Sequence, residues 1–231
     1  TARIVSDPVL PVPADSSPSP PAPRHLLWLL LWLALVPVVM LADRPVYEAY
    51  DRWVGGLISL DGVARFLTNA VAVQWIALGA VVLVIADRRL RWWFMGELTA
   101  VMIAQAGVVE VVKRLFGRLR PEKAEHLTIF RGPDFAHSNY CFPSGHAAAA
   151  FALAGVLSAW YPRWRWAFIA VAICVCLARL QLQRHFPSDL LFGAWLGWVL
   201  AGGVLTCQRR WTRRQSQPRP DPGDERAATQ A

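Results

Sequence analysis

The chain has 231 residues, of which 55% are hydrophobic, and it includes twelve tryptophans. This composition excludes an ordinary soluble domain, and the length exceeds that of a single anchored helix, so a polytopic membrane protein is the first expectation. The net charge of +8 would suggest nucleic-acid binding in a soluble protein. The arginines sit at the ends of apolar runs instead of on one continuous face, which membrane topology explains better.

Six apolar runs follow one another along the chain, and each is close to the length that a helix needs to cross the hydrocarbon core. They cover residues 26–42, 70–86, 92–112, 145–161, 164–178 and 189–207. They predict an all-α fold, with six transmembrane helices in one bundle. We interpret the first run as a retained helix, because no good signal-peptide cleavage site follows it.

The two ends of the chain are proline-rich or polar, which is typical of disordered tails. We expect a proline-rich tail over residues 1–25, a membrane domain over residues 26–207 and a basic tail over residues 208–231. The four cysteines show neither a disulfide framework nor a zinc-binding spacing.

Arginines in short connections predict the orientation of the helices. Residues 87–91 hold three arginines, residues 162–165 hold two, and four more follow the sixth run. By the positive-inside rule, these segments and both termini face the cytoplasm. The first, third and fifth connections then face outward, so the end of the third helix and the start of the fourth lie on the outer side.

The outward end of the third run, KRLFGRLRP, carries a cluster of cations. Lys113 and Arg120 are seven residues apart, so on a continuing helix they would share one face, two turns apart. Pro121 would then end the helix. The side chains of Arg114 and Arg118 are expected to reach lipid headgroups instead.

The fourth run begins with the motif PSGH. Ser144 is a good N-cap, Gly145 allows close approach of the backbone, and the first N–H groups of the helix form an anion site. By itself, the motif would be interpreted as an ordinary helix cap with an incidental His146. A serine-hydrolase elbow is disfavoured, because FPSGH lacks the glycine pattern around a nucleophilic serine.

The fifth connection, RLQLQRHFPSD, holds Arg179, His185 and Asp189. A carboxylate four residues after a histidine can accept its N–H, fix its tautomer and leave the other nitrogen able to attack. A metal site would need a third ligand, which His146 could supply, but the neighbouring cations would repel a metal.

Two histidines, three cations and a helix N-terminus on one side of a membrane describe a phosphate site. The cations and backbone N–H groups would stabilise the charge that develops in an in-line displacement at phosphorus. One histidine would attack phosphorus, and the other would protonate the departing oxygen.

The order Lys-x6-Arg-Pro, Pro-Ser-Gly-His and Arg-x5-His-x3-Asp resembles the tripartite signature of the type 2 phosphatidic acid phosphatase family. The resemblance implies a lipid phosphatase that needs no metal or cofactor, in which His185 forms a phosphohistidine, Asp189 supports it and His146 is the general acid. It implies that the phosphate is bound by Lys113, Arg120, Ser144, Gly145 and Arg179. In one departure, Ala178 stands where the family often has a serine, which removes a hydroxyl donor but no charged group.

We therefore expect a phosphomonoesterase or diphosphatase in the cytoplasmic membrane of a bacterium, with its site on the outer, periplasmic side. Its partners would be the membrane and a phospholipid or polyprenyl phosphate, with no nucleic acid. The candidate substrates are phosphatidic acid, phosphatidylglycerophosphate, undecaprenyl diphosphate and lipid A phosphates. The sequence leaves open phosphotransfer by the same histidine, a catalytically silent anion-binding membrane protein, and the oligomeric state. The related vanadium haloperoxidases are soluble, and six spans argue against their chemistry.

Some residues outside these motifs carry structural expectations. Glu110 either pairs with Lys113 or reaches the interface, and Glu97 is expected to neutralise a cytoplasmic arginine or to face another helix. Gly193 and Gly197 form a G-x-x-x-G pair that predicts close helix packing. His126 and His137 in the third connection are expected to be solvent-exposed loop histidines, with headgroup recognition as the alternative, and no role is predicted for Cys141.

Overall fold

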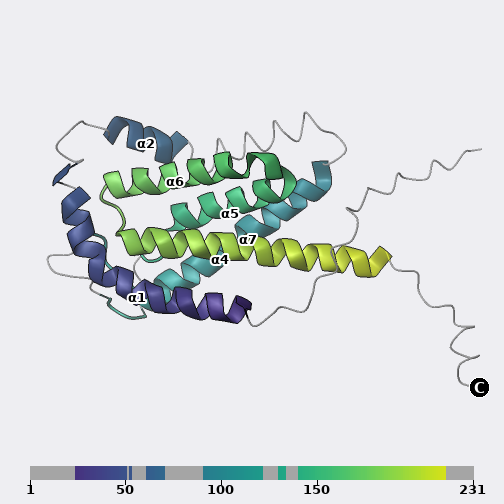
Figure 1. Ribbon diagram of the computed structural model, residues 1–231, viewed down its shortest axis with the longest axis horizontal. Coiled ribbons are helices and arrows are strands. Elements are labelled where there is room, and N and C mark those ends of the chain that lie inside the picture. Colours follow the sequence, from purple (N-terminus) through teal and green to yellow (C-terminus); the bar gives the residue numbers. More distant parts are fainter. Residues whose placement is uncertain are drawn as a thin grey trace, which may run out of the picture.

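The computed structural model describes residues 24–50, 52–53, 61–70, 91–121, 130–133 and 140–216. Within these residues the chain is mostly helical, as the sequence predicts, and two isolated antiparallel bridges join the segments between helices. The helices are α1 (Arg24–Tyr50), α2 (Asp61–Ala70), α4 (Arg91–Phe116), α5 (Gly145–Trp160), η3 (Pro162–Trp164), α6 (Arg165–Gln181) and α7 (Pro187–Ser216) (Figure 1).

Helix α5 is the centre of the described helices and packs against α4, α6 and α7 (Figure 1). Its first turns contain four consecutive alanines, Ala147 to Ala150, and all four are buried. Their small side chains let neighbouring helices approach on several sides. The side chain of Ser144 caps the helix by accepting the N–H of Ala147 at 3.4 Å. The helix ends at Trp160, just before the residue that precedes Pro162.

The predicted glycine pair packs α7 closely against α5, which confirms the expectation. A Cβ atom on Gly193 would lie 2.6 Å from the carbonyl oxygen of Ser144, and one on Gly197 would overlap the backbone of Ala148. The contact joins the start of α7 to the start of α5, where the Ser144 N–H donates to the Asp189 carbonyl at 3.0 Å. Two of the predicted motifs are therefore fixed to each other through backbone atoms.

Three described helical stretches are long and apolar enough to cross a membrane: Trp93–Phe116, Pro162–Gln181 and Pro187–Thr212. Gly145–Trp160 is a shorter apolar helix. The second predicted span, residues 70–86, lies outside the described residues apart from Ala70. The total of six spans and the orientation of the termini therefore stay predictions.

Helices α1 and α7 extend well beyond the apolar runs that predicted them. α1 continues past residue 42 to Tyr50, and α7 continues past residue 207 to Ser216. Residues 208–216 are therefore helical, and the expectation of a disordered tail was wrong for them. Arginine and glutamine are good helix formers, and cations are favourable at a helix C-terminus. The remainder of both expected tails lies outside the described residues, apart from the start of α1 at Arg24.

Candidate active site

The three predicted clusters meet at one end of the described helices, near the end of α4, the start of α5 and the turn between α6 and α7. A Cβ atom on Gly145 would lie 3.7 Å from the Nζ atom of Lys113, so the end of α4 contacts the start of α5. His146 lies within electrostatic range of charged or titratable groups from the other two clusters: Lys113, Arg120, Arg179 and His185.

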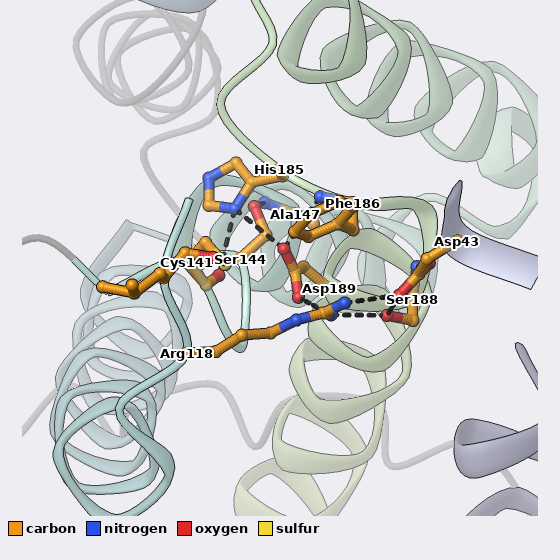
Figure 2. A network of polar contacts seen from close by, with 10 residues as sticks. Asp43, Arg118, Cys141, Ser144, Ala147, His185, Phe186, Ser188 and Asp189 are labelled. Carbon is orange, nitrogen blue, oxygen red and sulfur yellow. Dashed lines mark hydrogen bonds and ion pairs between the residues drawn. The ribbon is translucent and has the colours of Figure 1, made fainter. Parts of the chain in front are cut away.

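His185 is buried, and its two ring nitrogens have different surroundings. Nδ1 lies 3.0 Å from the carbonyl oxygen of Cys141 and 3.7 Å from Oδ2 of Asp189 (Figure 2). A carbonyl oxygen only accepts, so we assign the proton of the neutral imidazole to Nδ1, which leaves the lone pair on Nε2. The sequence assigned the N–H to Asp189, whereas the nearer acceptor is the Cys141 carbonyl.

The environment of His185 favours the neutral ring. Burial lowers the pKa of His185, and the cations of Arg179 and Lys113 act in the same direction. The carboxylate of Asp189 opposes them. A neutral ring with its proton on Nδ1 is the form of histidine that can act as a nucleophile through Nε2.

Asp189 lies in the first turn of α7, and both of its carboxylate oxygens accept hydrogen bonds. Oδ2 accepts the backbone N–H of Phe186 at 2.8 Å, and Oδ1 accepts Nη1 of Arg118 at 2.5 Å. The contact to Phe186 is one half of a capping box, and a negative charge is favourable at this end of the helix. These two bonds hold the carboxylate in one orientation.

Arg118 is the main residue that the sequence analysis placed wrongly. The prediction sent its side chain to the lipid headgroups, but the side chain is fully buried. It donates to Oδ2 of Asp43 at 2.6 Å and to Oγ of Ser188 at 2.7 Å, in addition to Asp189 (Figure 2). The Cζ atom of its guanidinium lies over the ring of Phe186, 4.3 Å from the ring centre.

A turn at Gly117 explains this inward direction. α4 ends at Phe116, and Gly117 adopts φ +58, which favours glycine. The expected helix through Pro121 is therefore wrong, and Lys113 and Arg120 do not share a helical face. Beyond the turn, Arg118 belongs to an extended segment that forms a bridge to Phe130. Gly117, five residues after the apolar run of residues 92–112, was the sequence signal for this helix end.

The charges around Arg118 keep it protonated. Burial by itself would lower its pKa, but the carboxylates of Asp189 and Asp43 outweigh burial and raise it. Asp43 is in turn held by Ser188, whose N–H and hydroxyl both donate to its carboxylate. The carboxylate of Asp43, on α1, thus caps the first turn of α7.

Cys141 has a structural role that the sequence did not reveal, because it is hydrogen-bonded to the segment after α4. Its N–H donates to the carbonyl of Arg118 at 2.9 Å, and its thiol donates to the carbonyl of Leu119 at 3.0 Å. Burial raises the pKa of this thiol well above its usual range, with the charge of Asp189 adding to the effect. The thiol therefore stays neutral and holds the loop that presents the Cys141 carbonyl to His185.

The comparison with known proteins identifies the family. A family model described as the PAP2 superfamily matches residues 94–213, which is slightly more than half of the chain. The chain belongs to the PAP2 superfamily. The resemblance inferred from the three motifs is therefore confirmed. The matched region includes α4, α5, α6 and most of α7, and so it contains all three motifs.

Two curated relatives of this PAP2 protein are lipid A 1-phosphatases, from Rhizobium johnstonii and Rhizobium etli. Each is 32% identical over 121 residues, which is 50% of this chain and 50% or 52% of the relative. The chain thus spans about half the length of the curated relatives it matches.

Two crystal structures share the fold of this PAP2 protein. One is a transmembrane PAP2 type phosphatidylglycerolphosphate phosphatase from Bacillus subtilis, with a TM-score of 0.62 and 22% identity over 81% of this chain and 97% of the other. The second is LpxE from Aquifex aeolicus, with a TM-score of 0.55 and 20% identity over 71% of this chain and 95% of the other. At these identities the likeness concerns the fold.

Several smaller expectations for the PAP2 protein can now be compared with the structure. Glu110 forms an ion pair with Arg114 at 2.7 Å on the exposed side of α4. Glu110 therefore does not depend on Lys113 alone for a partner, and Arg114 does not depend on lipid headgroups alone. Glu97 is buried and accepts Nε1 of Trp160 at 2.6 Å, with Arg209 at 3.7 Å, as expected of a carboxylate that faces other helices. His126 and His137 lie outside the described residues.

Two observations concern ligands of the predicted site. The buried Nε of Arg179 has no hydrogen-bond partner among the described residues. This donor is therefore available to bind an anion. Within the described ranges, no group of three or more His, Cys, Asp or Glu side chains is arranged to hold a metal ion. That statement includes the set considered from the sequence, His146, His185 and Asp189.

Proposed function

We propose that this PAP2 protein is a membrane lipid phosphatase that hydrolyses a phosphate ester or diphosphate through a covalent phosphohistidine on His185. One observation carries the proposal: the Cys141 carbonyl accepts the N–H on Nδ1 of a buried, neutral His185. Nε2 then has the lone pair, and the cations of Lys113 and Arg179 act electrostatically on this ring. This is the arrangement that a histidine nucleophile requires.

In the first step, Nε2 of His185 attacks phosphorus and the bond from phosphorus to the lipid oxygen breaks. His146 donates a proton to that oxygen, so the lipid leaves as an alcohol or a monophosphate. A bound dianion offsets the surrounding positive charge and thereby favours protonated His146. Asp189 stabilises the imidazolium that forms when His185 carries the phosphoryl group.

In the second step, a water molecule attacks the phosphohistidine. His146, now neutral, accepts a proton from this water, and the bond between Nε2 and phosphorus breaks. Inorganic phosphate leaves, and both histidines return to their starting states. The atoms of one water molecule are consumed in each cycle, as hydrolysis requires.

The charge that develops on phosphorus would be stabilised without a metal. The cationic ligands in the proposal are Lys113, Arg120 and Arg179, and the unpaired Nε of Arg179 is one donor ready for an oxygen. Ser144 and Gly145 would contribute the N-terminus of α5, where helix N–H groups bind anions. No cofactor enters the proposed reaction.

We propose a membrane topology and a substrate to test first. Six spans would place both termini in the bacterial cytoplasm and the site at the outer face of the cytoplasmic membrane. The names of the curated relatives put lipid A 1-phosphate first among the substrates. Phosphatidic acid, phosphatidylglycerophosphate and undecaprenyl diphosphate complete the panel.

The test is phosphate release by the purified protein, with His185→Ala as the comparison. We expect the parent to release phosphate from at least one lipid in the panel, and His185→Ala to lose activity by a factor of about 10⁴ or more, as removal of a nucleophile does. Parental activity in a folded His185→Ala protein would contradict the proposal. Product analysis with a labelled donor distinguishes hydrolysis from phosphotransfer, which would place the label on a second lipid or sugar.

A further inference from the structure

We propose that Arg118 is a positioning residue that orients Asp189 and His185 for attack on phosphorus. Asp43 on α1 and the hydroxyl of Ser188 hold Arg118 in turn. Arg118, Asp43 and Ser188 themselves lie outside the motif positions assigned to phosphate binding or proton transfer. The role rests on the proposed function, because it concerns the geometry of the same nucleophile.

The contacts of Arg118 use the fork shape of its guanidinium. Nη1 donates to Oδ1 of Asp189 at 2.5 Å and to Oγ of Ser188 at 2.7 Å, while Nη2 donates to Oδ2 of Asp43 at 2.6 Å. Two nitrogens in one rigid plane thus connect two carboxylates from different helices. A lysine ammonium is a point charge on a flexible stem and would not reproduce this bridge.

These contacts restrict the catalytic carboxylate. With Oδ1 bound to Arg118 and Oδ2 bound to the Phe186 N–H, the carboxylate of Asp189 cannot rotate, and Oδ2 stays 3.7 Å from Nδ1 of His185. Figure 2 shows Arg118 reaching Asp189 on the side of the carboxylate away from His185. The guanidinium also covers the ring of Phe186, the residue that follows His185 in the chain.

The charges of the group match the proposed reaction. Arg118 carries one positive charge, whereas Asp43 and Asp189 carry one negative charge each, and all three side chains are almost completely buried. The group therefore has an excess of one negative charge beside a neutral His185. That excess is balanced when His185 becomes a phosphorylated imidazolium. Loss of Arg118 would leave two uncompensated carboxylates in the interior.

A purely structural anchor between α1 and α7 would affect all ligands of the site alike. A positioning role predicts a split between two anions. Inorganic phosphate binds through the cations and helix N–H groups, which Arg118 does not contact. Orthovanadate imitates the five-coordinate transition state, and its binding depends on an aligned Nε2 at His185. Only the affinity for orthovanadate should change strongly when Arg118 is replaced.

The experiment uses the full chain in detergent, as the parent, Arg118→Met and Arg118→Lys. Arg114→Met is the matched control, because Arg114 lies four residues earlier, in the last turn of α4, and pairs with Glu110 on the exposed side of that helix. Measured quantities are dissociation constants for phosphate and orthovanadate, and kcat and KM for a short-chain lipid phosphate.

In Arg118→Met we expect orthovanadate affinity and kcat to fall by a factor of about 10 to 100, with phosphate affinity and KM within about threefold of the parent, as for an interaction realised in the transition state. The orthovanadate affinity and kcat of Arg118→Lys should lie between those of Arg118→Met and the parent. Arg114→Met should match the parent in every measured quantity. Equal losses for phosphate and orthovanadate, or no loss for either, would overturn the proposal.

Asp43→Asn is the second variant if Arg118→Met does not fold, since the amide keeps the shape and an acceptor for Arg118. The same split, smaller in size, is expected. If neither variant yields folded protein, the group is structural and the positioning role is wrong. Failure of the proposed function would look different: the parent itself would release no phosphate, and His185→Ala would leave orthovanadate affinity unchanged.

Discussion

At His185, a backbone atom determines which ring nitrogen carries the proton. The acceptor is the carbonyl oxygen of Cys141, at 3.0 Å from Nδ1. No substitution at Cys141 removes this atom, so the tautomer depends on the position of the loop. The loop is held by bonds from the Cys141 N–H and thiol to the carbonyls of Arg118 and Leu119. Side-chain motifs cannot reveal such a contact, which is why the sequence assigned the N–H to Asp189.

The first prediction concerns the pH dependence of kcat/KM. Its acidic limb reports protonation of the free enzyme, here of His185, whose pKa burial lowers and Asp189 raises. In Asp189→Asn the carboxylate that raises this pKa is gone, while Arg118 keeps Asp43 as its ion-pair partner. The neutral ring then persists to lower pH, so the acidic limb should move to lower pH, at a reduced maximal rate.

The measurement compares pH profiles of parent and Asp189→Asn on one substrate, so that titration of the substrate's own phosphate affects both profiles equally. Asp43→Asn serves as a second comparison, because it removes a carboxylate that contacts Arg118 instead of His185. A limb that moves to higher pH in Asp189→Asn would contradict the assignment of this limb to His185.

Among the elements, the contact between α5 and α7 fixes two of the three motifs to each other. Both sides consist of small residues, glycines on α7 and alanines on α5, and Gly155 of α5 likewise faces Ala201 of α7. Without a hydrophobic driving force between helices in lipid, close packing and backbone contacts provide the association. The site geometry therefore depends on residues that touch no substrate.

The second prediction follows from these glycines. Gly193→Ala would force a methyl group against the Ser144 carbonyl, and Gly197→Ala would force one against Ala148. Each should lower the free energy of unfolding by about 1–3 kcal/mol through overpacking. Because Gly193 lies beside the motif, Gly193→Ala should also lower kcat. Thermal unfolding in detergent and phosphate release provide the two measurements.

Gly202→Ala and Gly203→Ala are matched controls on the same helix, since a Cβ atom at either position would meet nothing within 4 Å. Both should be neutral, or stabilising by up to about 1 kcal/mol because alanine has the higher helix propensity. Equal stability of the Gly197→Ala and Gly202→Ala proteins would show that the two helices are not packed as described.

The end of α4 shows why the sequence predicted the helices better than it predicted the directions of side chains beyond their ends. The apolar run gave the helix, but the seven-residue spacing of Lys113 and Arg120 suggested that it continued to Pro121. Gly117 ends it earlier, in a left-handed conformation that a side chain would disfavour. The same turn directs Arg118 inward, so one misplaced helix end accounts for the wrong environment expected for that arginine.

At the scale of the whole molecule, the meeting of the three motifs was predictable because it follows from counting spans. An even or odd number of crossings places each connection on one side of the membrane, without any knowledge of packing. The pairing of Asp43 with Arg118 was not predictable, because 75 residues separate them and no local pattern joins them. Pairs of this kind depend on how α1 packs against the bundle.

The third prediction tests the orientation of the molecule. If the site faces outward, Arg131 lies on the outer side, next to Phe130, which forms the bridge to Arg118. Arg163 then lies in the cytoplasmic turn between α5 and α6. Both side chains are exposed. We would place single cysteines as Arg131→Cys or Arg163→Cys in a protein whose native cysteines are serines, since serine keeps the donor of Cys141 to Leu119.

A membrane-impermeant maleimide applied to intact spheroplasts should label Arg131→Cys fully and Arg163→Cys only after permeabilisation. The physical reason is the distribution of arginines: the short turn at Arg163 is held in the cytoplasm, because translocating its cations is unfavourable. The reverse labelling pattern would place the phosphate site in the cytoplasm, where its lipid substrate would have to be in the inner leaflet. Phosphate release by both variants shows that the labelled proteins are folded, so the pattern reports the orientation of the active molecule.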